Sequence, residues 1–171
     1  MKYGLKQWGR GLVAGLLLWF ALLPATGAPV PDMPLQHLDG RPAALADYVG
    51  KGKWVLVMFW SVDCAICARE MPDIARFHAR HKDRDAIVLG VAIDGREQVP
   101  AIRRFLRRHG ANFESLVGEL LDVAVGYERA AQEPFRGTPT FWFFSPKGEL
   151  LGNNPGPVRI SALERFMARH R

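Results

Sequence analysis

The stretch WVLVMFW at residues 54–60 decides the fold. It is an uninterrupted apolar run containing β-branched and aromatic residues, and such a run is typical of a central strand covered on both faces. The sequence CAIC at residues 64–67 follows almost directly and contains both cysteines of the chain. We therefore expect a buried strand that leads into a helix beginning at Asp63 or Cys64. Asp63 is the expected N-cap, and the helix is expected to end near His81.

Further strands and helices alternate on both sides of this run. Strands are predicted at 35–38, 87–92 and 140–144, with 149–151 as the returning strand of a hairpin. A helical turn is predicted at 45–48, and helices at 99–109, 120–127 and 160–170. Strands that alternate with helices and close with a hairpin and a helix predict an α/β protein. The expected architecture is a three-layer α/β/α sandwich with a mixed central sheet.

The N-terminal segment has the pattern of an export signal. Three basic residues in 1–10 precede twelve apolar residues at 12–23, and a proline and small residues follow. This order is that of a secretory signal peptide, while 11–28 is also near the minimum length of a membrane span. We predict a signal peptide or N-terminal membrane anchor over 1–27, a proline-rich lead-in over 28–34, and one domain over 35–171. The expected location is the periplasm, with anchoring to the inner membrane through 11–28 as the alternative to cleavage.

Composition excludes several classes of protein. The chain has 171 residues, of which 49% are hydrophobic, so it can form a core and is not a disordered protein. Three of the 23 basic residues, and none of the 17 acidic ones, lie in the first 28 positions, so the remainder carries a net charge of only +3. A charge this small makes no case for nucleic-acid binding.

The spacing of the two cysteines suggests redox chemistry. A helix N-terminus has unpaired N–H groups and a partial positive charge, and both stabilise a thiolate. Two intervening residues bring the second sulfur within disulfide distance of the first. Cys64, at the exposed edge, is expected to attack a disulfide of the substrate, and Cys67, one turn deeper, to resolve the mixed disulfide.

Two other interpretations of the cysteine pair remain open at this point. The pair could be a passive structural disulfide, although so short a loop would add little stability. It could also be half of a metal site, but zinc sites use about four ligands and the chain has no third cysteine. His78 and His81 share a helix face but lie far along the helix from Cys67, so a solvated face is the simpler explanation. We expect no metal and no cofactor.

From about Leu35 onward, the chain resembles the thioredoxin-like superfamily in its exported TlpA/ResA-type branch of thiol–disulfide oxidoreductases. The resemblance is carried by DGRP at 39–42, by the CAICAREMP helix at 64–72 and by GTPT at 137–140. The segment 94–127 resembles the extra helical insertion of that branch. The resemblance implies a thioredoxin-like fold and a redox-active disulfide between Cys64 and Cys67.

The resemblance also implies roles for other residues. Pro139 corresponds to a cis-proline that faces the cysteines, and Thr138 supplies backbone groups beside it that pair with a substrate strand. Glu70 corresponds to an acidic residue that takes part in proton transfer during catalysis. Trp60 corresponds to an aromatic residue that packs beside the site and contacts substrate.

Three positions depart from the family pattern. Met58 stands where thioredoxin has a buried aspartate, so that proton acceptor is absent. Asp63 stands where the family usually has tryptophan, at a position that would contact substrate. Its charge would oppose a thiolate on Cys64, unless the carboxylate caps the helix instead. The pair Ala65-Ile66 replaces more familiar residues and leaves the redox direction open.

The leading hypothesis is an exported reductase of protein disulfides that receives electrons from a membrane thiol donor. The resemblance suggests apocytochrome c, in cytochrome c biogenesis, or copper-site proteins as substrates. Alternatives are an envelope disulfide oxidant or isomerase, and a thioredoxin-like chaperone that holds Cu(I) between the cysteines. A peroxidase of the peroxiredoxin type fits the close cysteine pair poorly.

Overall fold

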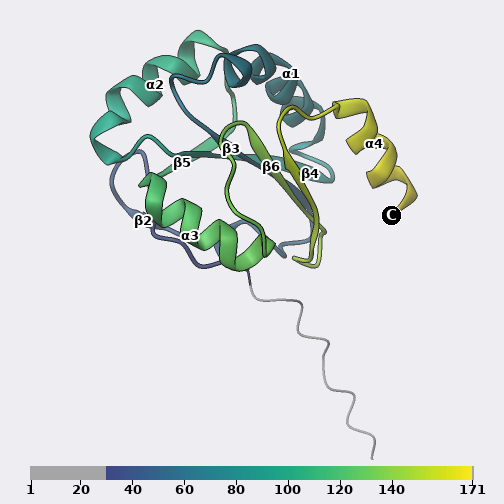
Figure 1. Ribbon diagram of the computed structural model, residues 1–171. Coiled ribbons are helices and arrows are strands. Elements are labelled where there is room, and N and C mark those ends of the chain that lie inside the picture. The colour runs from purple at the N-terminus through teal and green to yellow at the C-terminus, as the bar shows by residue number, and fades with distance from the viewer. Residues whose placement is uncertain (1–29, 171) are drawn as a thin grey trace, which may run out of the picture.

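The computed structural model describes residues 30–170 (Figure 1). The predicted signal peptide or anchor at 1–27 and the first residues of the predicted lead-in therefore lie outside the described residues. Within the described part, no helix is both long enough and apolar enough to cross a bilayer.

The central sheet has seven strands in the order β2-β1-β5-β4-β3-β6-β7. The strands are β1 (Leu35–His37), β2 (Pro42–Ala43), β3 (Trp54–Trp60), β4 (Ala86–Ala92), β5 (Glu114–Gly118), β6 (Thr140–Phe144) and β7 (Leu150–Pro155). The pairs β3–β4 and β4–β5 are parallel, whereas the β1–β2, β1–β5, β3–β6 and β6–β7 pairs are antiparallel. The sheet is therefore mixed, as predicted.

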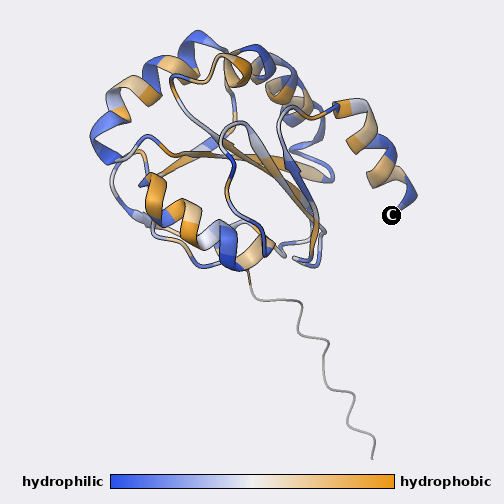
Figure 2. Cartoon of the chain, in the orientation of Figure 1, coloured by the Kyte–Doolittle hydropathy of each residue, from blue (hydrophilic) through white to orange (hydrophobic). Residues whose placement is uncertain are grey.

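Helices cover both faces of this sheet. They are α1 (Ala65–His81), α2 (Val99–Arg108), α3 (Leu120–Ala131) and α4 (Ile160–Arg169), with single 3₁₀ turns η1 (Leu45–Asp47) and η2 (Arg96–Gln98). Apolar residues concentrate on the strands, while the helices carry apolar and polar residues together (Figure 2). The three-layer α/β/α architecture predicted from the sequence is confirmed.

Strand β3 contributes to both layers of the core because all seven of its residues are buried. Successive side chains of a strand point to opposite faces. Met58 and Trp60 accordingly pack with Cys67 of α1 and with residues of α2 and α4. Val57 and Phe59 pack on the other face with residues of η1 and α3. The burial of both faces explains why this strand has no alternation of polar and apolar residues.

Among the differences between the predicted and the observed elements, two bear on the site. Strand β5 at Glu114–Gly118 was not predicted, because the segment 94–127 was interpreted as a helical insertion. Ser115 interrupts the apolar pattern of β5, but it is buried and accepts a hydrogen bond from Trp60 Nε1 at 3.2 Å. The N-cap of α1 is Cys64 rather than Asp63, because the Cys64 sulfur accepts the hydrogen bond from the Cys67 amide.

Candidate active site

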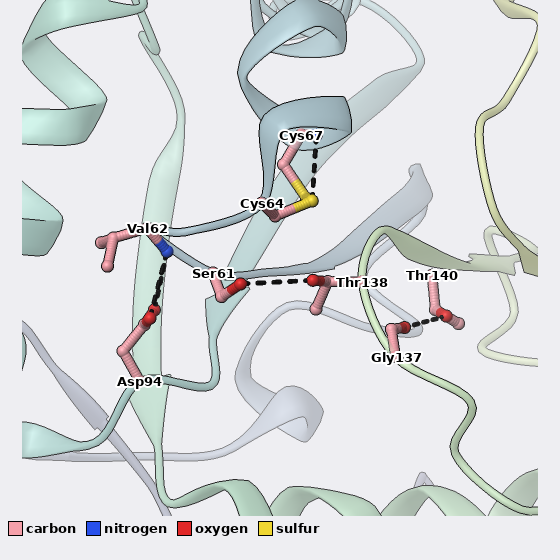
Figure 3. Close-up of a disulfide and its surroundings, with 8 residues drawn as sticks. All are labelled: Ser61, Val62, Cys64, Cys67, Asp94, Gly137, Thr138 and Thr140. Atoms are coloured by element: carbon pink, nitrogen blue, oxygen red, sulfur yellow. Dashed lines mark hydrogen bonds between the residues drawn. A yellow bond between two sulfur atoms is a disulfide. The ribbon is translucent and has the colours of Figure 1, made fainter.

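The two cysteines lie at the N-terminus of α1 and are joined by a disulfide (Figure 3). Their Cα atoms are 5.2 Å apart, and Cys64 Sγ accepts a hydrogen bond from the backbone N–H of Cys67 at 3.0 Å. Cys67 is completely buried, whereas Cys64 is only partly buried. Cys64 is therefore the sulfur that an incoming molecule can reach, and the helix N-terminus supplies a donor to that same sulfur.

The turn between β3 and α1 is held by hydrogen bonds to two other loops. Cys64 N–H donates to the carbonyl of Ser61 at 3.2 Å, and the hydroxyl groups of Ser61 and Thr138 are hydrogen-bonded at 3.2 Å. The N–H of Val62 donates to the Asp94 carboxylate, at 3.0 Å to Oδ1 and 3.3 Å to Oδ2. Figure 3 shows Thr138 and Asp94 reaching this turn from different segments of the chain.

The loop before β6 faces the disulfide. The Thr138–Pro139 peptide bond is cis, which confirms the sequence prediction. Thr140 Oγ1 donates to the Gly137 carbonyl at 2.7 Å, and Gly156 N–H donates to the Pro139 carbonyl at 2.8 Å. Among residues 30–170, no backbone-to-backbone hydrogen bond is made by Thr138. These bonds fix the loop while leaving one peptide unit beside the cysteines open to a partner strand.

A groove runs between the disulfide-bearing helix and this loop. It has a volume of about 380 Å³ and is lined by Ile66, by the loop 136–140 and by residues 155–156. Ile66 lies between the two cysteines, and its side chain is 38% exposed. The groove therefore places an apolar surface next to the only reachable sulfur. We call it the disulfide groove.

Glu70 lies one turn after Cys67 on α1 and is half-buried. Its Oε1 accepts a hydrogen bond from Val158 N–H at 3.0 Å, while its buried Oε2 has no hydrogen-bond partner among the described residues. Burial raises the pKa of Glu70 above its ordinary value, although the Val158 amide and the charge of Arg69 act in the opposite direction. A carboxylate with a raised pKa accepts a proton more readily than an ordinary one.

Asp94 is a further residue of the site that no sequence motif marks. It follows β4, and its carboxylate is the acceptor for the turn that precedes Cys64. Burial raises the pKa of Asp94, and the negative charge of Asp63 raises it further, while the Val62 amide lowers it. The sequence signal that could have identified it is an acidic residue two positions after a buried parallel strand, at the edge of the sheet where the neighbouring strand β3 leads into the cysteine-bearing helix.

Asp63 and Trp60 are both predicted to contact substrate, but in the structure only Asp63 is exposed. Asp63 is exposed beside Cys64 and does not cap the helix. Trp60 is completely buried, stacks on Phe105 and donates its indole N–H to Ser115. Its predicted contact with substrate is corrected, because the ring is part of the core beneath the site and has no exposed surface.

The chemistry available at the site is that of the sulfur pair. Met58 is fully buried in the same apolar cluster as Cys67, so β3 provides no carboxylate there. Across residues 30–170, no three His, Cys, Asp or Glu side chains gather in a way that could hold a metal ion. The site has a reachable sulfur on Cys64, a buried sulfur on Cys67 and the half-buried carboxyl group of Glu70 on the same helix. This arrangement can perform thiol–disulfide exchange.

Comparisons with known proteins agree with this geometry. Residues 26–151 match the AhpC/TSA family. The thiol-disulfide oxidoreductase ResA of Halalkalibacterium halodurans is 26% identical over 145 residues, which cover 85% of this chain and 77% of the relative. ResA of Bacillus subtilis is 25% identical over 82% of this chain and 73% of its own. A solved thiol:disulfide interchange protein from Bacteroides sp. superposes with a TM-score of 0.67, 25% identity, and coverage of 85% and 89%.

Replacement of Asp94 tests its role in holding the turn before Cys64. We expect Asp94→Ala to lower the free energy of unfolding by about 1–2 kcal/mol, because the half-buried Val62 amide loses its acceptor. Asp94→Asn keeps an acceptor oxygen and removes a charge that burial penalises. At pH 7 the Asn variant should therefore be at least as stable as the wild type, as measured by urea unfolding with the disulfide intact.

The pH dependence of stability provides the control. The pKa of Asp94 is raised above 3.8 in the folded state, so the folded protein binds this proton more tightly than the unfolded chain does. The contribution of Asp94 to the free energy of unfolding therefore falls as the pH rises from 3.8 through the raised pKa. This loss should be absent in Asp94→Asn. An Asn variant as unstable as the Ala variant at pH 7 would show that the acceptor for Val62 is not what matters.

Proposed function

The chain belongs to the AhpC/TSA family of thioredoxin-like proteins and is a thiol–disulfide oxidoreductase, and we propose that it acts outside the cytoplasm as a reductase of protein disulfides. The observation that carries the proposal is the asymmetry of the sulfur pair. Cys64 is only partly buried and lies two residues before Ile66 of the disulfide groove, whereas Cys67 is completely buried. A pair that differs in this way can attack with one sulfur and resolve with the other.

The proposed reaction begins with both cysteines reduced. The Cys64 thiolate attacks one sulfur of the substrate disulfide, so that a mixed disulfide forms and the other substrate sulfur leaves with the electron pair and takes up a proton. The Cys67 thiolate then attacks the Cys64 sulfur and releases the second substrate thiol. Two electrons pass to the substrate, and the Cys64–Cys67 disulfide seen in the structure is the oxidised product. A thiol donor, proposed to lie in the membrane, restores the dithiol.

Three further residues have proposed roles in this cycle. Glu70 accepts the proton of Cys67, since its raised pKa and its unpartnered Oε2 fit a group that exchanges a proton. The backbone of Thr138, beside Pro139, pairs with the substrate chain, because this peptide unit makes no backbone hydrogen bond within the described residues. Asp63 is exposed next to Cys64, and its proposed role is to contact the substrate.

The proposed location follows from the sequence upstream of the domain. The basic, apolar and small-residue order of 1–28 is that of an export signal or anchor, and disulfides persist outside the cytoplasm. Protein disulfides would be the substrates there, with apocytochrome c and copper-site proteins as the candidates to test.

The proposed direction, reduction of the substrate, follows from the charges around Cys64. Strongly oxidising members of this fold owe their high potential to a stabilised reduced form. Here Asp63 directly precedes Cys64, and the Asp94 carboxylate is bonded to Val62 in the turn between β3 and α1. The negative charge of both residues opposes a thiolate on Cys64. A less stable reduced form has a lower potential, and a low potential suits a reductase.

Single-cysteine variants test the order of the two sulfurs. We expect Cys67→Ser to accumulate a mixed disulfide between Cys64 and a disulfide-bearing protein substrate, because the resolving sulfur is missing. Cys64→Ser should accumulate none, because Cys67 is completely buried. Non-reducing electrophoresis followed by mass spectrometry of the linked peptides measures both. Trapping through Cys67 in the Cys64→Ser variant would contradict the proposed roles.

The reduction potential of the Cys64–Cys67 pair tests the direction. Equilibration in graded thiol buffers should give a value below about −200 mV, closer to thioredoxin at about −270 mV than to strong oxidants at about −120 mV. Asp63→Asn should raise the potential by roughly 10–20 mV, since about 30 mV corresponds to 1.4 kcal/mol for this two-electron couple. A potential near −120 mV would contradict the proposed reductase and indicate an oxidant or isomerase instead.

The variant Glu70→Gln tests the proton acceptor. It should slow the release of substrate from the mixed disulfide by about tenfold or more, because the Cys67 thiol loses its base. The effect should be largest above the raised pKa of Glu70, where the wild-type carboxyl is ionised, and should vanish at low pH, where both side chains are neutral. Stopped-flow fluorescence across pH 4–8 measures it. An equal slowing at every pH would indicate a structural role only.

A further inference from the structure

The disulfide groove carries one charged side chain of its own. Arg136 lies on the groove wall three residues before Pro139 and is exposed. Among the described residues, no carboxylate lies within ion-pair distance of its guanidinium, and this includes Glu133, three residues earlier in the chain. The other groove positions contribute apolar, glycine, proline and threonine surface. Arg136 therefore gives a mostly uncharged groove a positive edge.

The position of Arg136 relative to the bound substrate follows from the loop. Thr138 has the open peptide unit beside the disulfide, and Arg136 precedes it by two residues. A substrate chain that pairs with Thr138 while its cysteine contacts Cys64 is extended, and an extended chain advances about 3.3–3.6 Å per residue. Side chains within about two positions of the substrate cysteine then come within reach of the long arginine side chain.

The remaining wall sets a second requirement. Ile66 presents its exposed apolar surface between the two cysteines, on the helix side of the groove. Contact with Ile66 favours an apolar or small neighbour of the substrate cysteine, because an unpaired polar group placed there would lose its water. The groove thus combines an apolar helix side with a cationic loop side.

We infer that Arg136 makes the site selective for disulfides in acidic, extended peptide segments, with an Asp or Glu about two residues from the reacting cysteine. This inference rests on the proposed function, since it names the substrate class of the same site. An arginine guanidinium binds a carboxylate in a two-pronged geometry that a neutral side chain cannot reproduce. Charge pairing at the rim of an interface acts mainly on the rate of association. The preference for acidic substrates is therefore expected in kcat/KM, which includes the association step.

The test uses the reduced full-length protein and a set of short peptides. Each peptide has one cysteine in a mixed disulfide with 2-mercaptoethanol, and Glu, Gln or Lys two residues before or after the cysteine. For the wild type, the second-order rate constant of a single turnover, which corresponds to kcat/KM, should be about three- to fivefold higher for Glu than for Gln at low salt, and lowest for Lys. The preference should shrink in 0.5 M NaCl, because salt screens exposed charges.

Variants at Arg136 are compared with a matched control. Arg136→Gln should remove the preference, and Arg136→Glu should reverse it in favour of Lys. Arg108→Gln changes the net charge equally, at an exposed position at the end of α2, and should keep the wild-type preference. Reduction of bis(2-hydroxyethyl) disulfide, which is neutral and lacks a peptide, is measured for every variant, and each peptide rate is divided by it so that changes in the basic redox activity cancel.

The outcomes separate the two proposals. A wild type that reduces all peptides at one rate, or an Arg136→Gln variant that keeps the preference, overturns the role of Arg136 and leaves the reductase in place. Equal loss of the preference in Arg108→Gln also overturns it, since net charge alone would then be responsible. Failure to reduce any peptide or the neutral disulfide overturns the proposed function, and the selectivity with it.

Discussion

The structure depends on the burial of both faces of β3. Every residue of Trp54–Trp60 is buried, and the two faces belong to two separate apolar clusters, one under α1, α2 and α4 and one under α3. Burial of a large aromatic or aliphatic side chain contributes about 1.5–3 kcal/mol, so this strand is among the strongest contributors to stability in the domain. Because it is held from both sides, its carboxyl end is a fixed point from which the turn to α1 starts.

The site is built at this fixed point from segments that are distant in sequence. The turn after β3 bonds to Thr138 before β6 and to Asp94 after β4. Since β4 and β6 are the neighbours of β3 in the sheet, strand pairing places these segments beside the cysteines. The hydrogen bonds then set the local geometry. Two half-buried carboxyl groups have raised pKa values: Glu70, one turn after Cys67 on α1, and Asp94, which accepts from the turn before Cys64, and in both cases burial is the main cause.

Much of this arrangement is predictable from sequence because its signals are local. The apolar run of β3 predicts a buried strand, the cysteine spacing predicts the disulfide, and the family resemblance carried by the GTPT loop at 137–140 implies the cis peptide bond; the structure has all three. The features that were missed depend on pairing between distant segments. The strand character of β5 depends on its place beside β4 and on the bond from Trp60 to Ser115. The role of Asp94 depends on its hydrogen bond with the backbone amide of Val62, which is 32 residues away in the sequence, so no local sequence pattern reveals this partner.

The burial difference between the sulfurs also limits where the specificity of such a protein can reside. Cys67 is inaccessible, so a substrate meets only Cys64 and the surfaces that frame it. The helix N-terminus and the cysteine spacing supply the chemistry, and they do not distinguish one peptide disulfide from another. Discrimination must come from side chains around the groove, where Ile66 and Arg136 differ in polarity and charge from the loop backbone between them. We therefore propose that redox potential and substrate choice depend largely on different residues: Asp63 and Asp94, near the turn before Cys64, act on the potential, and Ile66 and Arg136 of the groove act on substrate choice.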